Sequence, residues 1–517
     1  MKKYYITTPI YYVNDLPHIG HVFTTVLADY IARSKRNLGY DVYFLTGTDE
    51  HGQKAEKTAK QTGITPQELA DRVVENYYKL WKQLNISYSD FIRTSESRHK
   101  KGAAEFFRIV HHNGDIYKGF YEGWYCVPCE LILPESTKEE EACPNCGRIA
   151  EKKIKEESYF FRLSNYQERL LEYYRSHPGC IKPESRYNEV MRFVESGLRD
   201  LSVSRVSITW GVPVPGDPSH IIYVWFDALS NYITALGWSD NDALFKQYWP
   251  ANIHLVGKDI VRFHCVYWPA FLMSAGIALP ETIFGHGWWM MHSAKMSKTL
   301  GNVLKPEPLL KMLGSDPVRY FLLREAPLDT DSEISLESII GRLNADLAND
   351  YGNLVSRTFQ MIHKYFGGSL NKKPALDTAE NSIINAFYSL KNQMDDYCTN
   401  LNLAEIFRQT WNIIYLLNKY IDEKQPWAKF KSPDNRDEVE GILYFICDFI
   451  RILSILLYPA MPESSTKLMD IFGIKPEEVT LEKTEYGQLP LGVQVPKSLI
   501  LFPRLDIKEV LKQYEIE

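Results

Sequence analysis

The first part of the chain alternates strand-like and helix-like patterns, and this alternation restricts the fold more than any other feature. Tyr4–Thr8 is a short β-prone run, and Phe23, Leu27 and Ile31 then recur every fourth residue, as on one face of a helix. Val42–Leu45 follows as a continuous apolar run, which is typical of a strand buried on both faces. A strand, a helix and a second strand form a parallel unit. The sequence therefore predicts an α/β fold with a doubly wound, Rossmann-type parallel sheet.

The rest of the 517 residues divides by pattern into further units. Between residues 117 and 219 the periodicity breaks into turns and a charged run, which indicates an insertion. Strand-like runs return at Ile221–Trp225, Ile253–Val256 and Thr282–Phe284, and we expect them to complete the sheet. From residue 343 the pattern is almost entirely helical and long enough for a separate bundle. The expected units are the first half of the sheet domain (1–116), the insertion (117–219), the second half of the sheet domain (220–290), a linking region (291–342) and a helical domain (343–517).

Charge and composition are those of an ordinary globular protein. The chain has 59 Lys and Arg against 65 Asp and Glu, so it offers no global attraction to nucleic acid, and a phosphate-binding face would need local clusters. The apolar stretch Ile442–Met461 is interrupted by Asp448 and Arg451, and its apolar residues recur at helical spacing. This predicts a buried bundle helix and not a membrane span. Without a recognisable signal peptide, we expect a cytoplasmic protein that does not associate with membranes.

Two histidines flank a glycine at the turn between the first strand and the first helix. His18 and His21 are three residues apart, on one side of the first helical turn. Gly20 has no Cβ that would keep a base or phosphate from the backbone, and the helix N-terminus adds N–H groups and the positive end of its dipole. We therefore expect a nucleotide site with His18 and His21 as catalytic residues and Gly20 as a binding residue.

Two lysines flank a serine in the linking region. Lys295 and Lys298 lie on either side of Ser297 in the motif AKMSKTLGN. An ammonium group is a compact charge that can neutralise a leaving pyrophosphate, so we expect both lysines to act in catalysis and all three residues to bind the nucleotide. An isolated Lys-x-x-Lys is more often a solvated loop, but the flanking residues make this a longer motif. The two motifs together predict a site for a nucleoside triphosphate.

Four of the eight cysteines form two Cys-x2-Cys pairs inside the predicted insertion. Four thiolates at this spacing can close a tetrahedral zinc site with no open position, so the sequence predicts one structural zinc ion rather than a catalytic metal or two disulfides. Iron, or oxidised thiols without metal, remain alternatives. The predicted ligands are Cys126, Cys129, Cys143 and Cys146.

The histidine and lysine motifs occur together in a known family. They resemble the HIGH and KMSKS signatures of class I aminoacyl-tRNA synthetases, with Thr299 as the last letter of the second signature, and the chain as a whole is most similar to the methionyl-tRNA synthetases. The resemblance implies that methionine and ATP, used with Mg²⁺, form methionyl adenylate and pyrophosphate. The methionine is then expected to pass to the terminal adenosine of tRNA(Met).

The resemblance also implies roles for residues that spacing alone leaves open. Gly257 and Asp259 are expected to contact the nucleotide, and Asp49 the ammonium group of methionine, although by position Asp49 fits a helix N-cap equally well. The expected methionine pocket consists of Ile10, Tyr12, Trp225, Ala228, Leu229, Tyr232, Ile260, His264 and Trp268. Residues expected to read the CAU anticodon are Asn353, Arg357 and Trp427.

Several alternatives fit part of the sequence. A cysteinyl enzyme of the same class would need a catalytic zinc, whereas the thiolates here are grouped away from the sheet. Synthetases for branched aliphatic amino acids carry a much larger editing insertion than the roughly 100 residues present here. A stand-alone nucleotidyltransferase would leave the helical domain without a role, and a non-catalytic zinc- and RNA-binding protein would leave the lysine motif without one. With no appended dimerisation module recognised, we expect a monomer.

Overall fold

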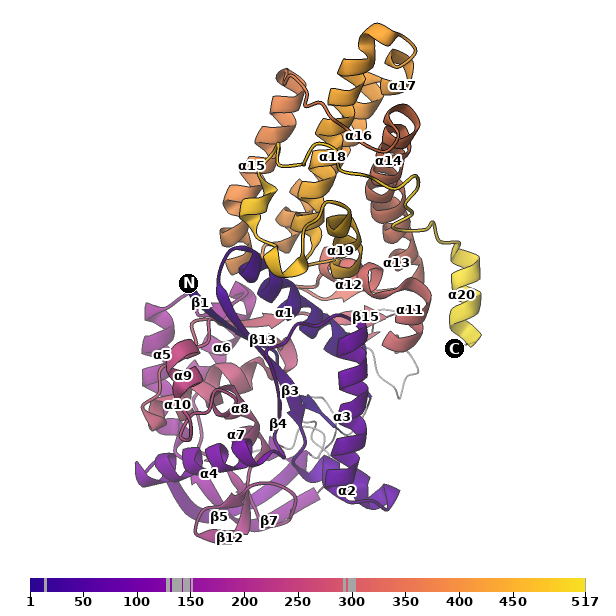
Figure 1. Cartoon of the computed structure of the whole chain (residues 1–517). Coiled ribbons are helices and arrows are strands. Elements are labelled where there is room, and N and C mark those ends of the chain that lie inside the picture. Colours follow the sequence, from indigo (N-terminus) through magenta and orange to yellow (C-terminus); the bar gives the residue numbers. More distant parts are fainter. Residues whose placement is uncertain are drawn as a thin grey trace.

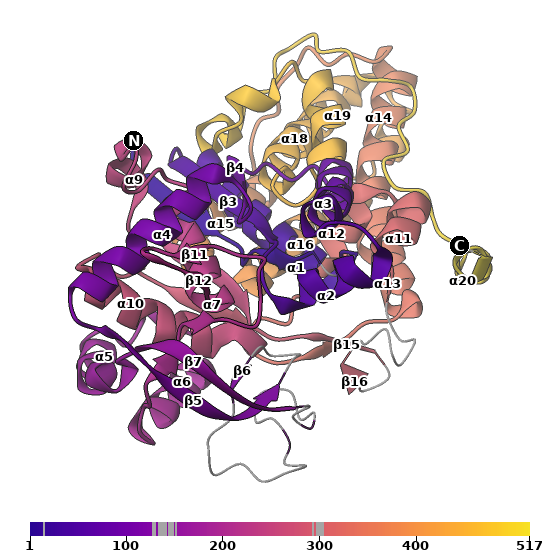
Figure 2. The ribbon, with the colours of Figure 1, turned by 90° about the horizontal axis from the view of Figure 1, so that it is seen from below.

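The computed structural model describes residues 1–13, 16–126, 131–132, 142, 149, 152–291, 294–295 and 304–516. A sheet with helices on its faces forms the lower part of the molecule in Figure 1, and a bundle of long helices stands above it. The predicted fold class is therefore confirmed. In both Figure 1 and Figure 2 the long strands β5 (Ile116–Cys126) and β7 (Lys152–Phe161) of the predicted insertion lie on the side of the sheet domain away from the helical bundle.

The central sheet is parallel and has the order β2-β3-β1-β13-β14-β8, with β4 pairing on β3. Because all its strands run the same way, their carboxyl ends meet at one edge, where parallel sheets bind ligands. The first strand and the apolar runs at Val42 and Ile253 take their predicted places in it. The strands are β1 (Lys3–Thr7), β2 (Tyr11–Tyr12), β3 (Asp41–Asp49), β4 (Asp90–Arg93), β8 (Ile181–Lys182), β13 (Ile253–Gly257) and β14 (Ile283–His286).

Helices cover both faces of this sheet. The first of them, α1, is buried on nearly every side because it lies between the sheet and the helical domain. The helices of this part are α1 (Ile19–Asn37), α2 (Gln53–Thr62), α3 (Pro66–Gln83), α4 (Ser97–His112), α7 (Val224–Leu229), α8 (Asn231–Thr234), α9 (Ala243–Tyr248) and α10 (Trp268–Ala275).

One predicted strand of the sheet is wrong. The run Ile221–Trp225 does not join the central sheet: its first part ends β12 (Asp217–Ile222), which pairs antiparallel with β10 (Ser204–Arg205) and β11 (Pro213–Val214), and its last part begins α7. The run is apolar because both the strand end and the first helical turn are buried, and a short buried run has no period that separates the two. The sheet gains β8 instead, from within the predicted insertion.

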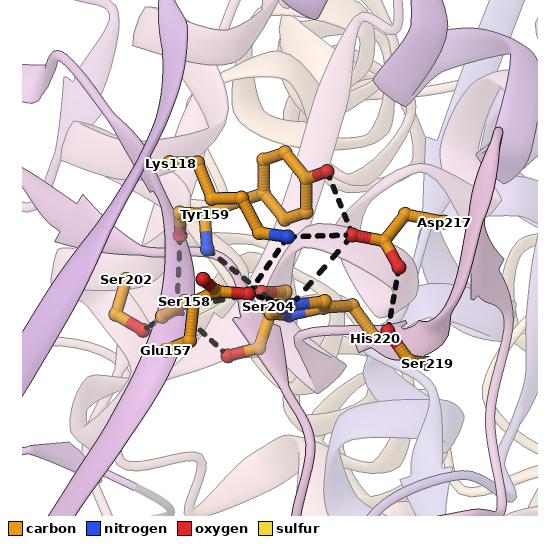
Figure 3. Close-up of polar contacts among 9 residues, drawn as sticks. All are labelled: Lys118, Glu157, Ser158, Tyr159, Ser202, Ser204, Asp217, Ser219 and His220. Atoms are coloured by element: carbon orange, nitrogen blue, oxygen red, sulfur yellow. Dashed lines mark hydrogen bonds and ion pairs between the residues drawn. The ribbon is translucent and has the colours of Figure 1, made fainter.

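The insertion is built on a long antiparallel pair, β5 (Ile116–Cys126) and β7 (Lys152–Phe161), with β6 (Leu131–Ile132) and β9 (Leu201–Ser202) at its edges and with α5 (Gln167–Ser176) and α6 (Glu184–Glu195). A polar cluster joins this sheet to β12 (Figure 3). Lys118 Nζ lies 2.7 Å from Glu157 Oε1 and 2.9 Å from Asp217 Oδ2, and the buried His220 lies 3.2 Å from Glu157. The two sheets of this region are therefore held together by ion pairs as well as by packing.

The linking region and the helical domain form a continuous structure. The predicted boundary at residue 343 falls inside an uninterrupted helical run, in which a π-helical stretch (Leu343–Gly352) joins α13 to α14. The strands are β15 (Trp289–Met291), β16 (Ala294–Lys295) and β17 (Ser332–Glu333), and the helices are α11 (Pro306–Leu313), α12 (Ser315–Arg324), α13 (Leu336–Arg342), α14 (Asn353–Phe366), α15 (Thr378–Thr399), α16 (Leu403–Lys424), α17 (Pro426–Lys429), α18 (Arg436–Leu457), α19 (Pro462–Ile471) and α20 (Ile507–Ile516).

The apolar stretch near residue 450 forms the core of this bundle, as predicted. It lies in α18, whose residues from Gly441 to Leu457 are all buried. The two charges that interrupt it neutralise each other, because Arg451 Nε donates to Asp448 Oδ1 over 2.6 Å. Among the described residues, none of the helices is both long enough and apolar enough to span a bilayer.

A buried ion pair, with the hydrogen bonds of its guanidinium, joins the sheet domain, the linking region and the helical domain. Arg319 of α12 and Asp29 of α1 are fully buried and lie 2.7 Å apart. The same guanidinium donates to the carbonyls of Leu84, at the end of α3, and of Pro459 and Ala460, just after α18. Burial alone would raise the pKa of Asp29, but Arg33, Arg319 and Ser87 outweigh it and lower that pKa to about 2.

We expect Asp29→Asn to destabilise the protein by about 3–5 kcal/mol at neutral pH, because it leaves the Arg319 guanidinium buried without its counter-charge. The urea midpoint of unfolding measures this. Asp242→Asn is the matched control, since Asp242 pairs with Lys246 on the surface, where a pair contributes about 0–1 kcal/mol. Equal losses in the two variants would contradict the role of the buried pair.

Candidate active site

A cavity of about 230 Å³ lies at the carboxyl ends of the central strands. Its walls come from the segment after β1, the end of β3, the N-terminus of α1, the helices α7 and α8, and the segments after β13 and β14. It brings together most residues that the sequence assigns to the nucleotide and to methionine. These are Ile10, Tyr12, His18, Gly20, His21, Asp49, Trp225, Ala228, Leu229, Tyr232, Gly257, Asp259, Ile260 and His264.

The two histidines of the first motif cap helix α1. His18 is the N-cap residue: its Nδ1 accepts from the N–H of Gly20 over 3.1 Å, and His21 Nδ1 accepts from the N–H of His18 over 3.3 Å. Because both Nδ1 atoms are acceptors, each neutral ring carries its hydrogen on Nε2. The rings stack with centroids 3.8 Å apart. The fold therefore fixes both the orientation and the tautomer of the pair.

Gly20 is needed for this arrangement in a way that the sequence did not indicate. A Cβ at this position would lie 2.9 Å from Cε1 of His18, so a larger residue would displace the ring that caps the helix. The predicted benefit, close approach of a ligand to the backbone, agrees with the position of Gly20 in the cavity wall.

The part of the cavity predicted to hold methionine has one carboxylate and a mainly aromatic and aliphatic wall. Asp49 is the last residue of β3 and is 4% exposed. It is not a helix cap, because α2 begins further along the chain with Gly52 as its N-cap. Trp225, Ala228 and Leu229 of α7 line the same cavity. The position of Asp49 at the carboxyl edge of the sheet suits the ammonium group of an amino acid.

Tyr232 and His264 form a fixed hydrogen-bonded pair in this wall. His264 Nδ1 lies 2.9 Å from the carbonyl of Ile260, to which it donates, so its Nε2 accepts from the Tyr232 hydroxyl over 2.7 Å. Burial lowers the pKa of His264 to about 4. The imidazole is therefore neutral at physiological pH, and this part of the wall presents no charge to a thioether.

The nucleotide part of the cavity includes residues that the sequence reasoning missed. His286 ends β14, and its Nε2 lies 2.8 Å from the hydroxyl of Thr24 on α1. Trp288 donates from Nε1 to Asp259 over 3.2 Å. Both residues closely follow the predicted strand Thr282–Phe284, so the rule that ligands bind at carboxyl ends of parallel strands could have found them.

Phe263 was also missed. Its ring stacks on Trp225 with centroids 3.7 Å apart and planes within 12°, so it backs the aromatic wall. The segment that carries it is a π-helical stretch (Phe263–Tyr267) between a 3₁₀ turn and α10, and not the single regular helix that the predicted spacing of Ile260, His264 and Trp268 assumes. Trp268 is consequently buried behind the wall, against Tyr232, and does not line the cavity.

A larger groove of about 890 Å³ adjoins the cavity and shares His18 with it. It lies between α3, α11 and α19, and its described lining includes none of the residues predicted for methionine. The smaller cavity is therefore the better candidate for the amino acid.

The lysine motif is described only in part. Lys295 lies in β16, where it pairs with Met290 of β15, and β15 in turn pairs with β17. Ser297 and Lys298 lie outside the described residues.

The cysteine motif is framed by two antiparallel pairings. Cys126 is buried at the end of β5 and pairs with Leu131 of β6. Ala142 and Ile149 pair antiparallel on either side of the second. Cys129, Cys143 and Cys146 lie outside the described residues, and within the described part no group of three or more His, Cys, Asp or Glu is arranged to hold a metal. Two hairpin-like pairings agree with the predicted four-thiolate donor set.

The predicted anticodon residues lie on α14 and α17, two helices of the bundle that stands above the sheet in Figure 1. Asn353 is exposed at the start of α14, and Arg357 follows one turn later. The Arg357 guanidinium lies 5.7 Å from the ring centroid of Trp427, which is 39% exposed on α17. Asp422 pairs with the same guanidinium over 3.0 Å. An exposed ring beside a guanidinium can stack and hydrogen-bond an unpaired base.

Comparison with known proteins agrees with this geometry. Residues 4–359 match the family described as tRNA synthetases class I (M), and residues 374–514 match the anticodon binding domain of methionyl tRNA ligase. The chain is 48% identical to the methionine–tRNA ligase of Caldanaerobacter subterraneus, over 99% of this chain and 81% of that one. It is 44% identical to that of Thermotoga maritima, over 99% and 82%.

Solved structures agree as well. The Mycobacterium tuberculosis methionyl-tRNA synthetase in complex with methionyl-adenylate superposes with a TM-score of 0.93 at 41% identity, covering 98% of this chain and all of that one. The apo form of the same enzyme gives a TM-score of 0.85 at 38% identity, covering 98% and 99%.

A parallel sheet with capped histidines at its carboxyl edge, joined to a helical anticodon domain, defines a class I aminoacyl-tRNA synthetase. Within that class, the chain belongs to the methionyl-tRNA synthetase family. The protein therefore catalyses the ligation of methionine to tRNA: it activates methionine with ATP and transfers the methionine to tRNA(Met).

His264 should make the folded protein sensitive to mild acid. Its pKa is about 4 in the folded state and 6.5 in the unfolded state, so only the unfolded chain gains a proton as pH falls from 7 to 5. We expect protonation of His264 in the unfolded chain to lower the free energy of unfolding by about 2 kcal/mol at pH 5 relative to pH 7. The difference between wild type and His264→Gln in urea unfolding at the two pH values measures it, and identical pH dependence would contradict the buried neutral state.

Proposed function

We propose that the cavity at the sheet edge holds methionine and ATP side by side and that the residues predicted from the sequence perform the two steps of the reaction. In the first step, a carboxylate oxygen of methionine attacks the α-phosphorus of ATP, the bond to the oxygen that bridges to the β-phosphate breaks, and pyrophosphate leaves. In the second step, a hydroxyl of the terminal adenosine of tRNA attacks the activated carbonyl, and AMP leaves.

The capped histidine pair carries this proposal. Two Nε2–H groups with a fixed tautomer, at the positive end of α1, suit the negative charge that develops on the α-phosphate. Asp49 would bind the ammonium group, and the wall of Trp225, Tyr232 and His264 would bind the thioether through apolar contact. Asp259 would accept from the ribose hydroxyls, with Gly257 allowing close approach.

Lys295 and Lys298, with Ser297, are proposed to neutralise the leaving pyrophosphate. Support comes from the sequence motif and from β16, which attaches the start of the motif to β15, next to the Trp288 wall of the cavity. Mg²⁺ accompanies ATP in enzymes that use it, and we expect it to be required here.

The helical domain is proposed to read the anticodon through Asn353, Arg357 and Trp427. Support comes from the contact between Arg357 and Trp427 and from Asn353, which precedes Arg357 by one turn of α14. Cys126, Cys129, Cys143 and Cys146 are proposed to hold one structural zinc ion; the antiparallel pairings at Cys126 and around the second Cys-x2-Cys support this. We further propose that the enzyme acts as a monomer in the cytoplasm.

His21→Ala should lower methionine-dependent pyrophosphate exchange by about 100- to 1,000-fold, because it removes one pre-oriented donor. Binding of tRNA(Met) should stay within about twofold, since the histidine lies far from the anticodon surface. His112→Ala, at an exposed position at the end of α4, is the matched control. Exchange driven equally well by another amino acid in the wild type would contradict the proposed function.

Trp427→Ala should have the opposite effect to His21→Ala: it should weaken tRNA binding and leave pyrophosphate exchange intact. Loss of a stacked base costs about 1–3 kcal/mol, so the KM for tRNA in aminoacylation should rise about tenfold or more while pyrophosphate exchange is retained. Tyr415→Ala removes another exposed aromatic of the helical domain and should leave both reactions unchanged. Unchanged charging by Trp427→Ala would remove this residue from the anticodon site.

Cys126→Ser should abolish zinc binding, measured as metal per chain by elemental analysis of the purified protein, where we expect about one zinc in the wild type. Cys180→Ser alters a buried cysteine outside the proposed set and should retain the metal. A wild-type protein without zinc, or zinc retained in Cys126→Ser, would contradict the four-thiolate site.

A further inference from the structure

Three buried polar side chains lie behind the methionine wall, and no step proposed above uses them. Asp227 of α7 is fully buried. Its Oδ2 lies 2.6 Å from Nδ1 of His51, and its Oδ1 lies 2.8 Å from Nε2 of His99. None of these three side chains lines the described cavity. They form a single cluster, which we call the Asp227 bracket.

Both histidines of the bracket bind the same carboxylate. The two imidazoles outweigh the effect of burial and hold the pKa of Asp227 well below its usual range, so the carboxylate is ionised. An ionised carboxylate only accepts, and both histidines therefore donate to it. His99 Nδ1 lies 2.8 Å from the hydroxyl of Thr234, so this ring has a polar contact at each nitrogen. The bonds thus hold each ring in one orientation.

The bracket connects the two halves of the proposed methionine site. Asp227 lies on α7 between Trp225 and Ala228, which line the cavity. His51 lies two residues after Asp49, on the half that carries the proposed ammonium-binding carboxylate. The bond between His51 and Asp227 is therefore a direct link between the carboxylate end and the aromatic wall, across 176 residues of sequence.

A close contact between α4 and α8 supports the bracket at His99. His99 is on α4, and Gly102 lies one turn later on the same helix. A Cβ on Gly102 would overlap Cγ2 of Thr234 on α8, so α4 approaches α8 as closely as a backbone without a side chain allows. This approach places His99 within reach of both Asp227 and Thr234, and it leaves α7 little freedom to shift.

We propose that Asp227, held by His51 and His99, is a positioning residue that sets the distance between the ammonium-binding carboxylate and the aromatic wall, and thereby selects for the length of the methionine side chain. The proposal rests on the methionine site proposed above. The amino acids it concerns are unbranched thioethers: ethionine, one methylene longer, and S-methylcysteine, one methylene shorter. In an apolar pocket one methylene changes kcat/KM by about 10- to 200-fold.

Asp227→Asn tests the proposal, because the amide keeps the shape of the carboxylate but cannot accept from both histidines. We expect the KM for methionine in pyrophosphate exchange to rise about tenfold, with kcat within about threefold and the KM for ATP unchanged. The preference in kcat/KM for methionine over ethionine and over S-methylcysteine should fall by about tenfold. A lower thermal midpoint with an unchanged preference would mean a merely structural role and would overturn the proposal.

Two controls keep the test decisive. Asp448→Asn changes another fully buried carboxylate, in α18 of the helical domain, and should lower stability while leaving the amino-acid preference unchanged. If Asp227→Asn does not fold, His51→Ala and His51→Asn replace it, because the asparagine amide can still donate to Asp227. The preference should fall in the first and be rescued in the second, and equal preferences in both would overturn the proposal.

Failure of the positioning role can be distinguished from failure of the proposed function. If the wild type exchanges pyrophosphate with methionine and the preference survives every bracket variant, only the positioning role fails. If methionine does not drive exchange in the wild type, the proposed function itself fails.

Discussion

Helix α1 is the element on which the rest of the molecule depends, because its two ends serve different domains. Its first turn holds the histidine pair through the capping bonds of His18. Further along, Asp29 pairs with Arg319, and the buried Lys35 lies 2.6 Å from Asp395 on α15. Charges buried at this depth are stable only when they are paired, so the helix cannot shift without breaking contacts to both domains. The helix that carries the histidine cap is thus tied by ion pairs to α12 and to α15 of the helical domain.

The active site is an edge of a sheet rather than a cleft between independent parts. Residues far apart in sequence, such as Asp49, Asp259 and His286, meet because each ends or follows a parallel strand. Polar groups then fix what the strands bring together: the Nδ1 atoms of His18 and His21 accept from backbone, and His264 is held neutral between a carbonyl and a hydroxyl. Pre-orientation of this kind is what electrostatic catalysis requires.

Much of the fold and of the candidate site was predictable from local sequence pattern. The first strand, helix α1 and strand β3 follow from periodicity, and the histidine motif lies at the carboxyl edge of the sheet, where its spacing predicts it. The error at Ile221–Trp225 shows where local pattern stops being informative. A buried run of five residues satisfies a strand and a helical turn equally well, and only its partners, β10 and β11, decide between them. Trp268 is not part of the described cavity lining for a related reason, since a π-helical stretch changes which face a residue presents.

The sequence by itself determined the class of fold, the kind of chemistry and the family, because these depend on residue types at fixed short spacings. The tertiary structure alone decided the tautomers of His18 and His21, the role of Gly20 against the His18 ring, and the pairing of Asp227 with two histidines from other elements. Such contacts join residues separated by up to 176 positions, as in His51 and Asp227. Their existence depends on how the packed helices and strands approach one another, which no local spacing contains.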